Sequence, residues 1–144
     1  MFSKACEYAI KAIIFIARQS LNGRRTNLKE ISEGTDSPEA FTAKVLQLLA
    51  KNQFIQSQKG AGGGFEMSID GMKNLVLLAI VRAIDGDKLI SECVLGLKEC
   101  SGVNPCPFHD KYAPVRSDLI RMLSETSIYQ LATGSTHGRT FLKN

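Results

Sequence analysis

The feature that most limits how this chain can fold is a glycine-rich run between two short segments of alternating character. Residues 54–58 are Phe-Ile-Gln-Ser-Gln, residues 65–68 are Phe-Glu-Met-Ser, and Lys-Gly-Ala-Gly-Gly-Gly lies between them. Alternation on both sides of a glycine-rich turn predicts a two-stranded hairpin. A phosphate-binding loop does not fit, because no Gly-Lys-Ser/Thr follows the run and Phe65 stands where the dinucleotide fingerprint needs glycine. The bland alternative is a flexible turn without a partner.

Three helical segments precede this hairpin. Apolar residues recur at helical spacing over residues 4–20, and Asn27 with Glu30 has the pattern of a capping box that opens a second helix. Ser37 is predicted to cap a third helix, with Pro38 at its first position. Three helices followed by a hairpin are typical of a winged-helix module, in which the second and third helices form the helix-turn-helix and the hairpin is the wing.

The third helix is predicted to have an inward and an outward face. We expect the inward stripe to consist of Phe41, Val45, Leu48 and Leu49. The outward face is small and polar, so it can approach another surface closely. An ordinary core helix is the alternative, and the wing that follows the helix favours DNA recognition over it. Side chains long enough to reach base edges alternate there with alanines that permit docking against thymine methyl groups. The predicted DNA-binding residues are Glu39, Ala40, Ala43, Lys44 and Gln47 on the helix, and Lys59 and Gly60 on the wing.

We therefore predict a mainly α fold: a winged helix-turn-helix over residues 1–70 and a helical dimerisation region over residues 71–132. The second region is expected to begin with a helix over residues 74–85. A long C-terminal helix over residues 112–125 has Val115, Leu119 and Met122 on one apolar stripe. Such a stripe needs an apolar partner.

The rest of the C-terminal half is less regular. Residues 87–110 lack helical periodicity, and Ser127 opens a short last helix with a capping-box pattern. Residues 133–144 are polar and are expected to form a flexible tail, in which His137 is solvated.

Three of the four cysteines gather in the irregular segment. Cys93, Cys100, Cys106 and His109 offer thiolates and an imidazole, which are ligands for iron–sulfur clusters and for structural zinc. In a reducing compartment, spaced cysteines favour metal or redox chemistry over disulfides. Structural zinc, a thiol redox switch and unrelated thiols stay open as alternatives. A Cys–His nucleophile is disfavoured because no catalytic-cysteine signature surrounds these residues, and we expect no enzyme.

Charge and hydropathy add limits of their own. The net charge is +4, but residues 1–70 and residues 71–144 each hold nine Lys/Arg and seven Asp/Glu, so DNA binding has to be argued from local placement. The longest apolar stretch, Leu75 to Val81, is too short to span a membrane. With no export peptide recognised at the N-terminus, we expect a cytoplasmic protein.

Taken together, these pieces resemble the IscR/NsrR-type winged-helix regulators (the Rrf-two family) over about residues 2–132. The matching pieces are Ser3-Lys4, Tyr8-Ala9, Glu30-Ile31-Ser32-Glu33, Leu49, Lys51-Asn52, the wing from Lys59 to Phe65, and the three-cysteine loop. The resemblance implies a homodimer formed through the helix at 112–125 and bound to double-stranded DNA at a pseudo-palindromic operator. It also implies a transcription regulator, expected to be a repressor, whose DNA affinity depends on an iron–sulfur cluster that senses iron–sulfur supply, nitric oxide or redox stress.

Two departures from the family pattern concern DNA recognition. The family's reading helix usually carries polar side chains where this chain has Ala40 and Ala43. The wing's frequent arginine is Lys59 here, which keeps the charge but loses bidentate recognition of guanine.

The resemblance leaves the fourth cluster ligand open. His109 corresponds to the ligand of IscR-like members with a 2Fe–2S cluster, and Glu7 lies where NsrR-like and RsrR-like members offer a carboxylate from the partner subunit. Cys6 is a third candidate. We favour His109 and a 2Fe–2S over a 4Fe–4S cluster, because imidazole is softer than carboxylate and His109 is local in sequence. A cluster-carrying redox protein without DNA binding is the further alternative.

Overall fold

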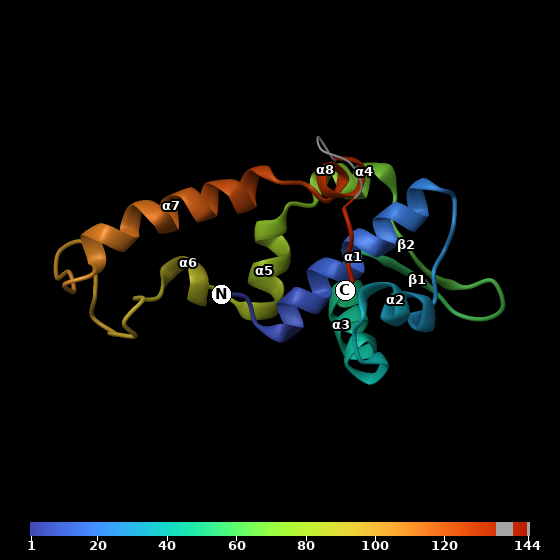
Figure 1. Ribbon diagram of the computed structural model, residues 1–144, viewed down its shortest axis with the longest axis horizontal. Coiled ribbons are helices and arrows are strands. Elements are labelled where there is room, and N and C mark those ends of the chain that lie inside the picture. The colour runs from blue at the N-terminus through green and yellow to red at the C-terminus, as the bar shows by residue number, and fades with distance from the viewer. Residues whose placement is uncertain (135–139, 144) are drawn as a thin grey trace.

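The computed structural model describes residues 1–134 and 140–143 (Figure 1). Within residues 1–134 the chain forms eight helices and one two-stranded antiparallel sheet. In chain order these are α1 (Lys4–Leu21), α2 (Leu28–Thr35), α3 (Glu39–Lys51), β1 (Gln56–Gln58), β2 (Gly64–Glu66), α4 (Ile69–Asn74), α5 (Leu77–Asp85), α6 (Lys88–Ser91), α7 (His109–Glu125) and α8 (Ile128–Thr133). This order confirms the predicted mainly α, winged-helix fold.

The first two helices begin where side chains satisfy their free backbone N–H groups. Ser3 Oγ accepts from the N–H of Cys6 at 3.0 Å. Asn27 and Glu30 form the predicted capping box, each side chain accepting from the other's backbone N–H at 2.9 Å. Local sequence therefore defines these starts, as expected for caps.

The start of α3 differs from the prediction. Pro38 is its N-cap residue, in an extended conformation with ψ 130°, and makes no side-chain capping bond. Ser37 is not the cap, because its hydroxyl is used elsewhere: it lies 2.8 Å from Thr35 Oγ1 and 2.7 Å from Thr42 Oγ1, in a buried network that joins α2 to α3. The network fixes the turn of the helix-turn-helix.

The inward stripe of α3 is also shifted. Leu48, predicted to face inward, is 41% exposed, whereas Leu46 is buried. Thr42, Val45 and Leu49 complete the buried face at helical spacing. The buried hydroxyl of Thr42 is the reason for the error, since a threonine is not counted in an apolar pattern.

The wing is held to the body by the connection between α1 and α2. β1 and β2 pair in register with Ser57 opposite Phe65, and both strands are shorter than predicted. Thr26 and Phe65 exchange backbone hydrogen bonds at 3.1 and 2.8 Å, so the connection adds a bridge to β2. Gly64 makes this possible: its φ is +134°, and a Cβ atom there would lie 2.6 Å from the carbonyl oxygen of Thr26.

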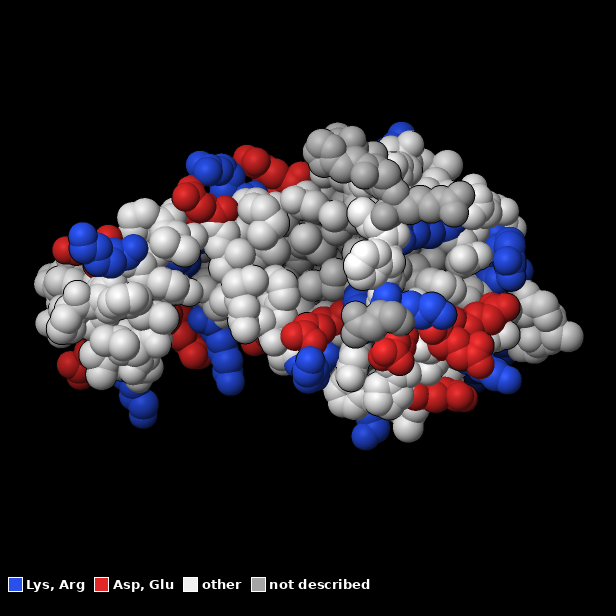
Figure 2. Space-filling view, in the orientation of Figure 1, with Lys and Arg blue, Asp and Glu red and all other residues white. Residues whose placement is uncertain are grey.

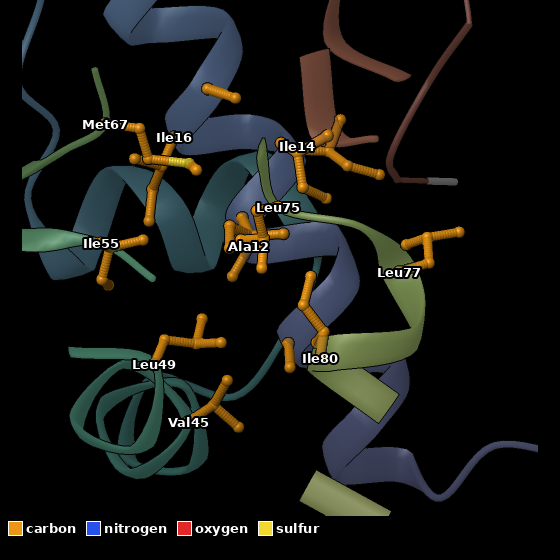
Figure 3. Packing of buried hydrophobic residues seen from close by; sticks show 14 of the residues in the cluster. Ala12, Ile14, Ile16, Val45, Leu49, Ile55, Met67, Leu75, Leu77 and Ile80 are labelled. Atoms are coloured by element: carbon orange, nitrogen blue, oxygen red, sulfur yellow. The ribbon is translucent and has the colours of Figure 1, made fainter. Parts of the chain in front are cut away.

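One hydrophobic core joins the two halves of the chain. Figure 3 shows Ile16 of α1, Val45 and Leu49 of α3, and Ile80 of α5 converging on it. Met72, Leu123 and Ile128, all beyond residue 70, belong to the same cluster and are fully buried. The predicted regions 1–70 and 71–132 therefore share their core.

The helix predicted over residues 74–85 begins at Leu77 instead, and α4 ends just before it. The cause is a long-range pairing: Val76 bridges Ser127, the N–H of Ile128 donates to Leu75 O at 2.9 Å, and the N–H of Leu77 donates to Thr126 O at 3.0 Å. These bonds hold residues 75–76 extended. The same bonds dock the start of α8, whose predicted capping box at Ser127 is confirmed.

The long helix α7 begins at His109, three residues earlier than predicted, and packs on α5 and α6 while extending away from the body (Figure 1). The short helix α6 occupies part of the segment predicted to be irregular.

In the predicted tail, Arg18 donates to the carbonyl oxygen of Thr140 at 3.3 Å. His137 lies outside the described residues. Within the described part of the chain, every helix is too short or too polar to cross a membrane.

Candidate metal centre and nucleic-acid interface

The segment between α6 and α7, residues 92–108, brings the predicted ligands together through tight turns. The N–H of Gly96 donates to Cys93 O at 2.8 Å, and the N–H of His109 donates to Cys106 O at 3.0 Å as α7 begins. The chain thus reverses after Cys93 and again after Cys106. In the following paragraphs we call residues 92–108 the cysteine segment.

The three sulfurs of the segment form one group. The Sγ atoms of Cys93, Cys100 and Cys106 all lie within 4.8 Å of one another, with 3.6 Å between those of Cys93 and Cys106. All three are free thiols. His109 Nδ1 lies 3.3 Å from Cys100 Sγ, so the imidazole adjoins the group on one side. Three convergent soft donors with an imidazole beside them fit the donor set of an iron–sulfur cluster, and equally that of a single zinc ion.

Backbone N–H groups tune these thiols. Cys106 is buried and the other two are half-buried. Hydrogen bonds from the backbone of Leu97, and then of Leu95, lower the pKa of Cys93 to about 7. A bond from the N–H of Cys106 favours the thiolate of Cys100, but desolvation and the two neighbouring thiols outweigh it and raise the pKa of Cys100. The group is therefore prepared to ionise first at Cys93, and thiolates are the form that binds metal.

A small cavity beside the sulfurs contains a residue that the sequence analysis missed. Its wall is made of the end of α6, the cysteine segment and the first turns of α7, namely Ser91, Cys93, Val94, Cys100, Cys106, His109, Tyr112, Ala113 and Arg116. The Arg116 guanidinium lies over the Tyr112 ring, 5.0 Å from its centroid, and Arg116 Nη2 donates to the carbonyl oxygen of Glu92. Helical spacing could have predicted that Arg116 adjoins the site. Tyr112 and Arg116, three and seven positions after His109, lie on the same face of α7 as His109.

The two alternative ligands near the N-terminus have different surroundings. Cys6 is fully buried on the inward face of α1, where burial, and then Asp85, raises its pKa to about 12. We exclude Cys6 as a ligand because a thiol enclosed by the core has no access to a cluster. Glu7 is half-buried, with its side chain 43% exposed, and pairs with Lys4 Nζ at 2.9 Å; the hydrogen bond from Lys4 lowers the pKa of Glu7. A carboxylate with this much exposed surface stays accessible from outside the protomer.

The predicted DNA-binding residues lie on an exposed part of α3 and on the wing. Exposed positions on α3 are Glu39, Ala40, Lys44 and Gln47, and Ala43 between them is half-buried. Lys59 and Gly60 are exposed on the hairpin turn, and Gly60 adopts a φ of +94° that favours glycine. In Figure 1 this wing is at one end of the molecule and the cysteine segment at the other, with α3 between them.

Basic residues near the wing are partly neutralised. Arg25 pairs with Glu66 at 3.1 Å, and Arg24 approaches Glu30 at 3.7 Å. On the face drawn in Figure 2, Lys and Arg side chains alternate with Asp and Glu, so basic charge is not gathered in one surface there. Any attraction of DNA phosphates therefore depends more on individual cations such as Lys59 than on the net charge of the chain.

The sequence matches known regulators over nearly its whole length. The Rrf2 family model, described as an iron-dependent transcriptional regulator, matches residues 2–134. A protein of Aquifex aeolicus (strain VF5), named as an HTH-type transcriptional regulator, is 28% identical over 133 residues, which cover 91% of this chain and 90% of that protein. The HTH-type transcriptional regulator IscR of Photorhabdus laumondii is 26% identical over 124 residues, covering 86% of this chain and 74% of its own.

Solved structures agree on the fold. CymR of B. subtilis, titled a global cysteine regulator, aligns with a TM-score of 0.75 at 19% identity, over 92% of this chain and 96% of its own. T. potens IscR aligns with a TM-score of 0.71 at 18% identity, over 97% of this chain and 92% of its own. At such identities the likeness shows a shared fold.

Proposed function

Because this chain belongs to the Rrf2 family of iron-dependent transcriptional regulators, we propose that it binds an operator as a homodimer and that an iron–sulfur cluster sets its DNA affinity. We propose Cys93, Cys100 and Cys106 as the protein thiolates that hold the cluster. The observation that carries the proposal is the convergence of these three sulfurs within 4.8 Å. Its family makes the chain a DNA-binding regulator and not an enzyme, and relatives named IscR support the cluster.

The DNA-binding part of the proposal assigns α3 to the major groove and the wing to the neighbouring groove. A two-fold dimer presents two copies of α3 and so reads a pseudo-palindrome. Lys44 and Gln47 are exposed and long enough to reach base edges, and the half-buried Ala43 lets the helix approach closely. Binding at such an operator would make the protein a repressor where the operator overlaps a promoter.

The decisive experiment is visible absorption and iron analysis of protein purified without oxygen. When bound, the cluster supplies iron that reacts with oxidants and nitric oxide. The wild type should be coloured, and Cys100→Ala should lose the colour and the iron. Cys6→Ala is the matched control, because it removes a thiol that lies in the core. A colourless protein with stoichiometric zinc would contradict the cluster assignment, and DNA affinity that does not depend on cluster content would contradict the regulatory role.

A second comparison tests the fourth ligand and with it the preference for 2Fe–2S. We propose His109, since its Nδ1 already adjoins Cys100 Sγ. His109→Ala should then alter the cluster spectrum and speed cluster loss, while Glu7→Ala leaves both unchanged. The reverse pattern would assign the site to the partner's carboxylate.

The dimer part of the proposal rests on α7. Within α7, which is described along its whole length, Leu123 is the one buried residue, while Val115 is 58% and Met122 is 45% exposed. Val115→Glu should give monomers that stay folded, because its side chain contributes little to the core of one protomer. Leu119 is half-buried against the core, so a charge there would mix dissociation with unfolding. Sedimentation at micromolar concentration, with the exposed Ser117→Glu as control, checks this; a monomeric wild type would contradict it.

One observation favours a second candidate, a thiol switch. The 3.6 Å between the sulfurs of Cys93 and Cys106 is close enough for a disulfide to form with little movement when an oxidant removes two electrons and two protons. A structural neighbour, S. aureus CymR, was crystallised in an oxidised form. Protein that lacks iron and carries a reversible Cys93–Cys106 disulfide by mass spectrometry would support the switch over the cluster.

A further inference from the structure

The cavity beside the three sulfurs contains a cation whose bonding is incomplete. Arg116 Nε is buried and, in the part of the chain that the structure describes, has no hydrogen-bond acceptor. A buried N–H without an acceptor is destabilising unless a bound group supplies one. The cavity that Arg116 lines is shared with Cys93, Cys100, Cys106 and His109.

The rest of the side chain is held in place. Arg116 Nη2 donates to the carbonyl oxygen of Glu92, next to Cys93, and the guanidinium lies over the Tyr112 ring. These two contacts fix the guanidinium between α7 and the cysteine segment, and among the described residues they leave Nε without an acceptor beside the cavity that the three cysteines also line. An arginine keeps its charge at any physiological pH.

We propose that Arg116 is a charge-balancing residue of the centre proposed above: it donates to the sulfur ligands and raises the reduction potential of the bound cluster. The inference rests on the proposed function. Three thiolates gather three negative charges in a partly buried site, and each electron taken up adds another. A cation fixed beside them stabilises the reduced form more than the oxidised form, because attraction grows with the charge it faces. Hydrogen bonds to cluster sulfurs and burial are known determinants of cluster potential.

The test is the midpoint potential of the cluster in wild-type protein, Arg116→Gln, Arg116→Lys and Arg121→Gln. Arg121 lies on the same helix with the same charge, but it is 66% exposed and pairs with Asp118 at 2.9 Å, so water screens it. Arg116→Gln should lower the ratio of reduced to oxidised cluster at a fixed potential about tenfold, which is about 59 mV for one electron. Arg116→Lys should restore most of the wild-type value, and Arg121→Gln should leave it unchanged.

The outcomes separate this inference from the proposed function. Wild-type protein without a cluster would overturn both. Wild-type protein with a cluster, and equal potentials in Arg116→Gln and Arg121→Gln, would overturn the role of Arg116 alone. If Arg116→Gln fails to hold a cluster, Arg116→Lys decides: a cluster at the wild-type potential supports charge balance, whereas loss of the cluster in this variant too would make Arg116 a structural tie to Glu92.

Discussion

The winged-helix body and the cysteine segment are held in place by different means. Residues such as Ile13 and Ile16 are fully buried in one continuous core. In the described segment 92–108, Cys106 is the one buried residue, while apolar side chains such as Leu97 and Val103 are 52% and 97% exposed. The body is specified by burial, whereas the segment is specified by turns and by hydrogen bonds to sulfur.

The difference suits a division of labour. A body whose stability comes from its core keeps its fold whatever the sulfurs bind. A segment with little core is expected to have low local stability, so its conformation would respond to whatever the sulfurs bind. The wing and the cysteine segment lie at opposite ends of the molecule (Figure 1). Within one protomer, a change at the sulfurs would reach α3 through α7 and α5, because α5 contacts α3 both directly and through α1. The proposed dimer would offer a second route.

The largest expected effect is on global stability. Ile13→Ala removes a fully buried side chain and should lower the free energy of unfolding by about 2–5 kcal/mol. Val103→Ala, at a position that is 97% exposed, should change it by less than about 0.5 kcal/mol. Urea denaturation of metal-free protein measures both. If the two substitutions lowered the free energy of unfolding equally, the cysteine segment would contribute to the core as much as the body does. The contrast between the two regions would then be wrong.

Thiol reactivity sharpens the same contrast. In metal-free protein at pH 8, Cys93 should be alkylated at least about a hundredfold faster than Cys6, because its thiolate predominates and is accessible. The pKa of Cys93 is lowered to about 7, so its rate should be half-maximal near pH 7 and level off about one pH unit above. Cys6 is buried and its pKa is raised to about 12, so its rate should stay low across this range. Mass spectrometry of the labelled peptides gives both rates; similar rates would show that the body opens as readily as the segment.

The sequence predicts what is local. Helical periodicity of α1, the capping box of Asn27 and the glycines of the wing act within a few residues, and each was confirmed. The grouping of Cys93, Cys100 and Cys106 could also be expected, because all three lie within one short segment.

Features that depend on distant residues were missed. The break at residues 75–76 exists because Ser127 and its neighbours pair with them, fifty residues later. Ser37 was assigned to a cap because a serine before proline is a common helix start, and its hydroxyl meets Thr35 and Thr42 only once α2 packs on α3. Arg116 was missed because its role depends on a cavity that forms only when α7 packs on the cysteine segment.

A third prediction asks whether the body alone reads sequence. If Gln47 or Lys44 reaches a base edge, its replacement by alanine should cost about 1–3 kcal/mol in binding the operator and relax the preference at one position in each half-site. Neither change should alter the cluster spectrum. Lys111→Ala, an exposed cation on α7 close to the cysteine segment, is the control and should leave base preference intact. If Lys111→Ala also lost base preference, the surface that recognises DNA bases would have to include α7 near the cysteine segment.

The smallest expected effect belongs to the wing. Lys59 is exposed on the hairpin turn, and among the described residues it forms no ion pair, so its charge is available to phosphates or to the minor groove. Lys59→Ala should weaken binding to all DNA sequences alike and should lower the slope of log affinity against log salt by about 0.9 for each phosphate contact removed. Lys98→Ala makes the same change of charge in the cysteine segment and should leave the slope unchanged. The two variants need titrations over one shared salt series, because affinities at different salt concentrations are not comparable. If Lys98→Ala and Lys59→Ala lower the slope equally, DNA contacts the cysteine segment as well as the wing. The winged-helix body would then not be the sole part of the protein that binds DNA, and the contrast between the two regions would be wrong.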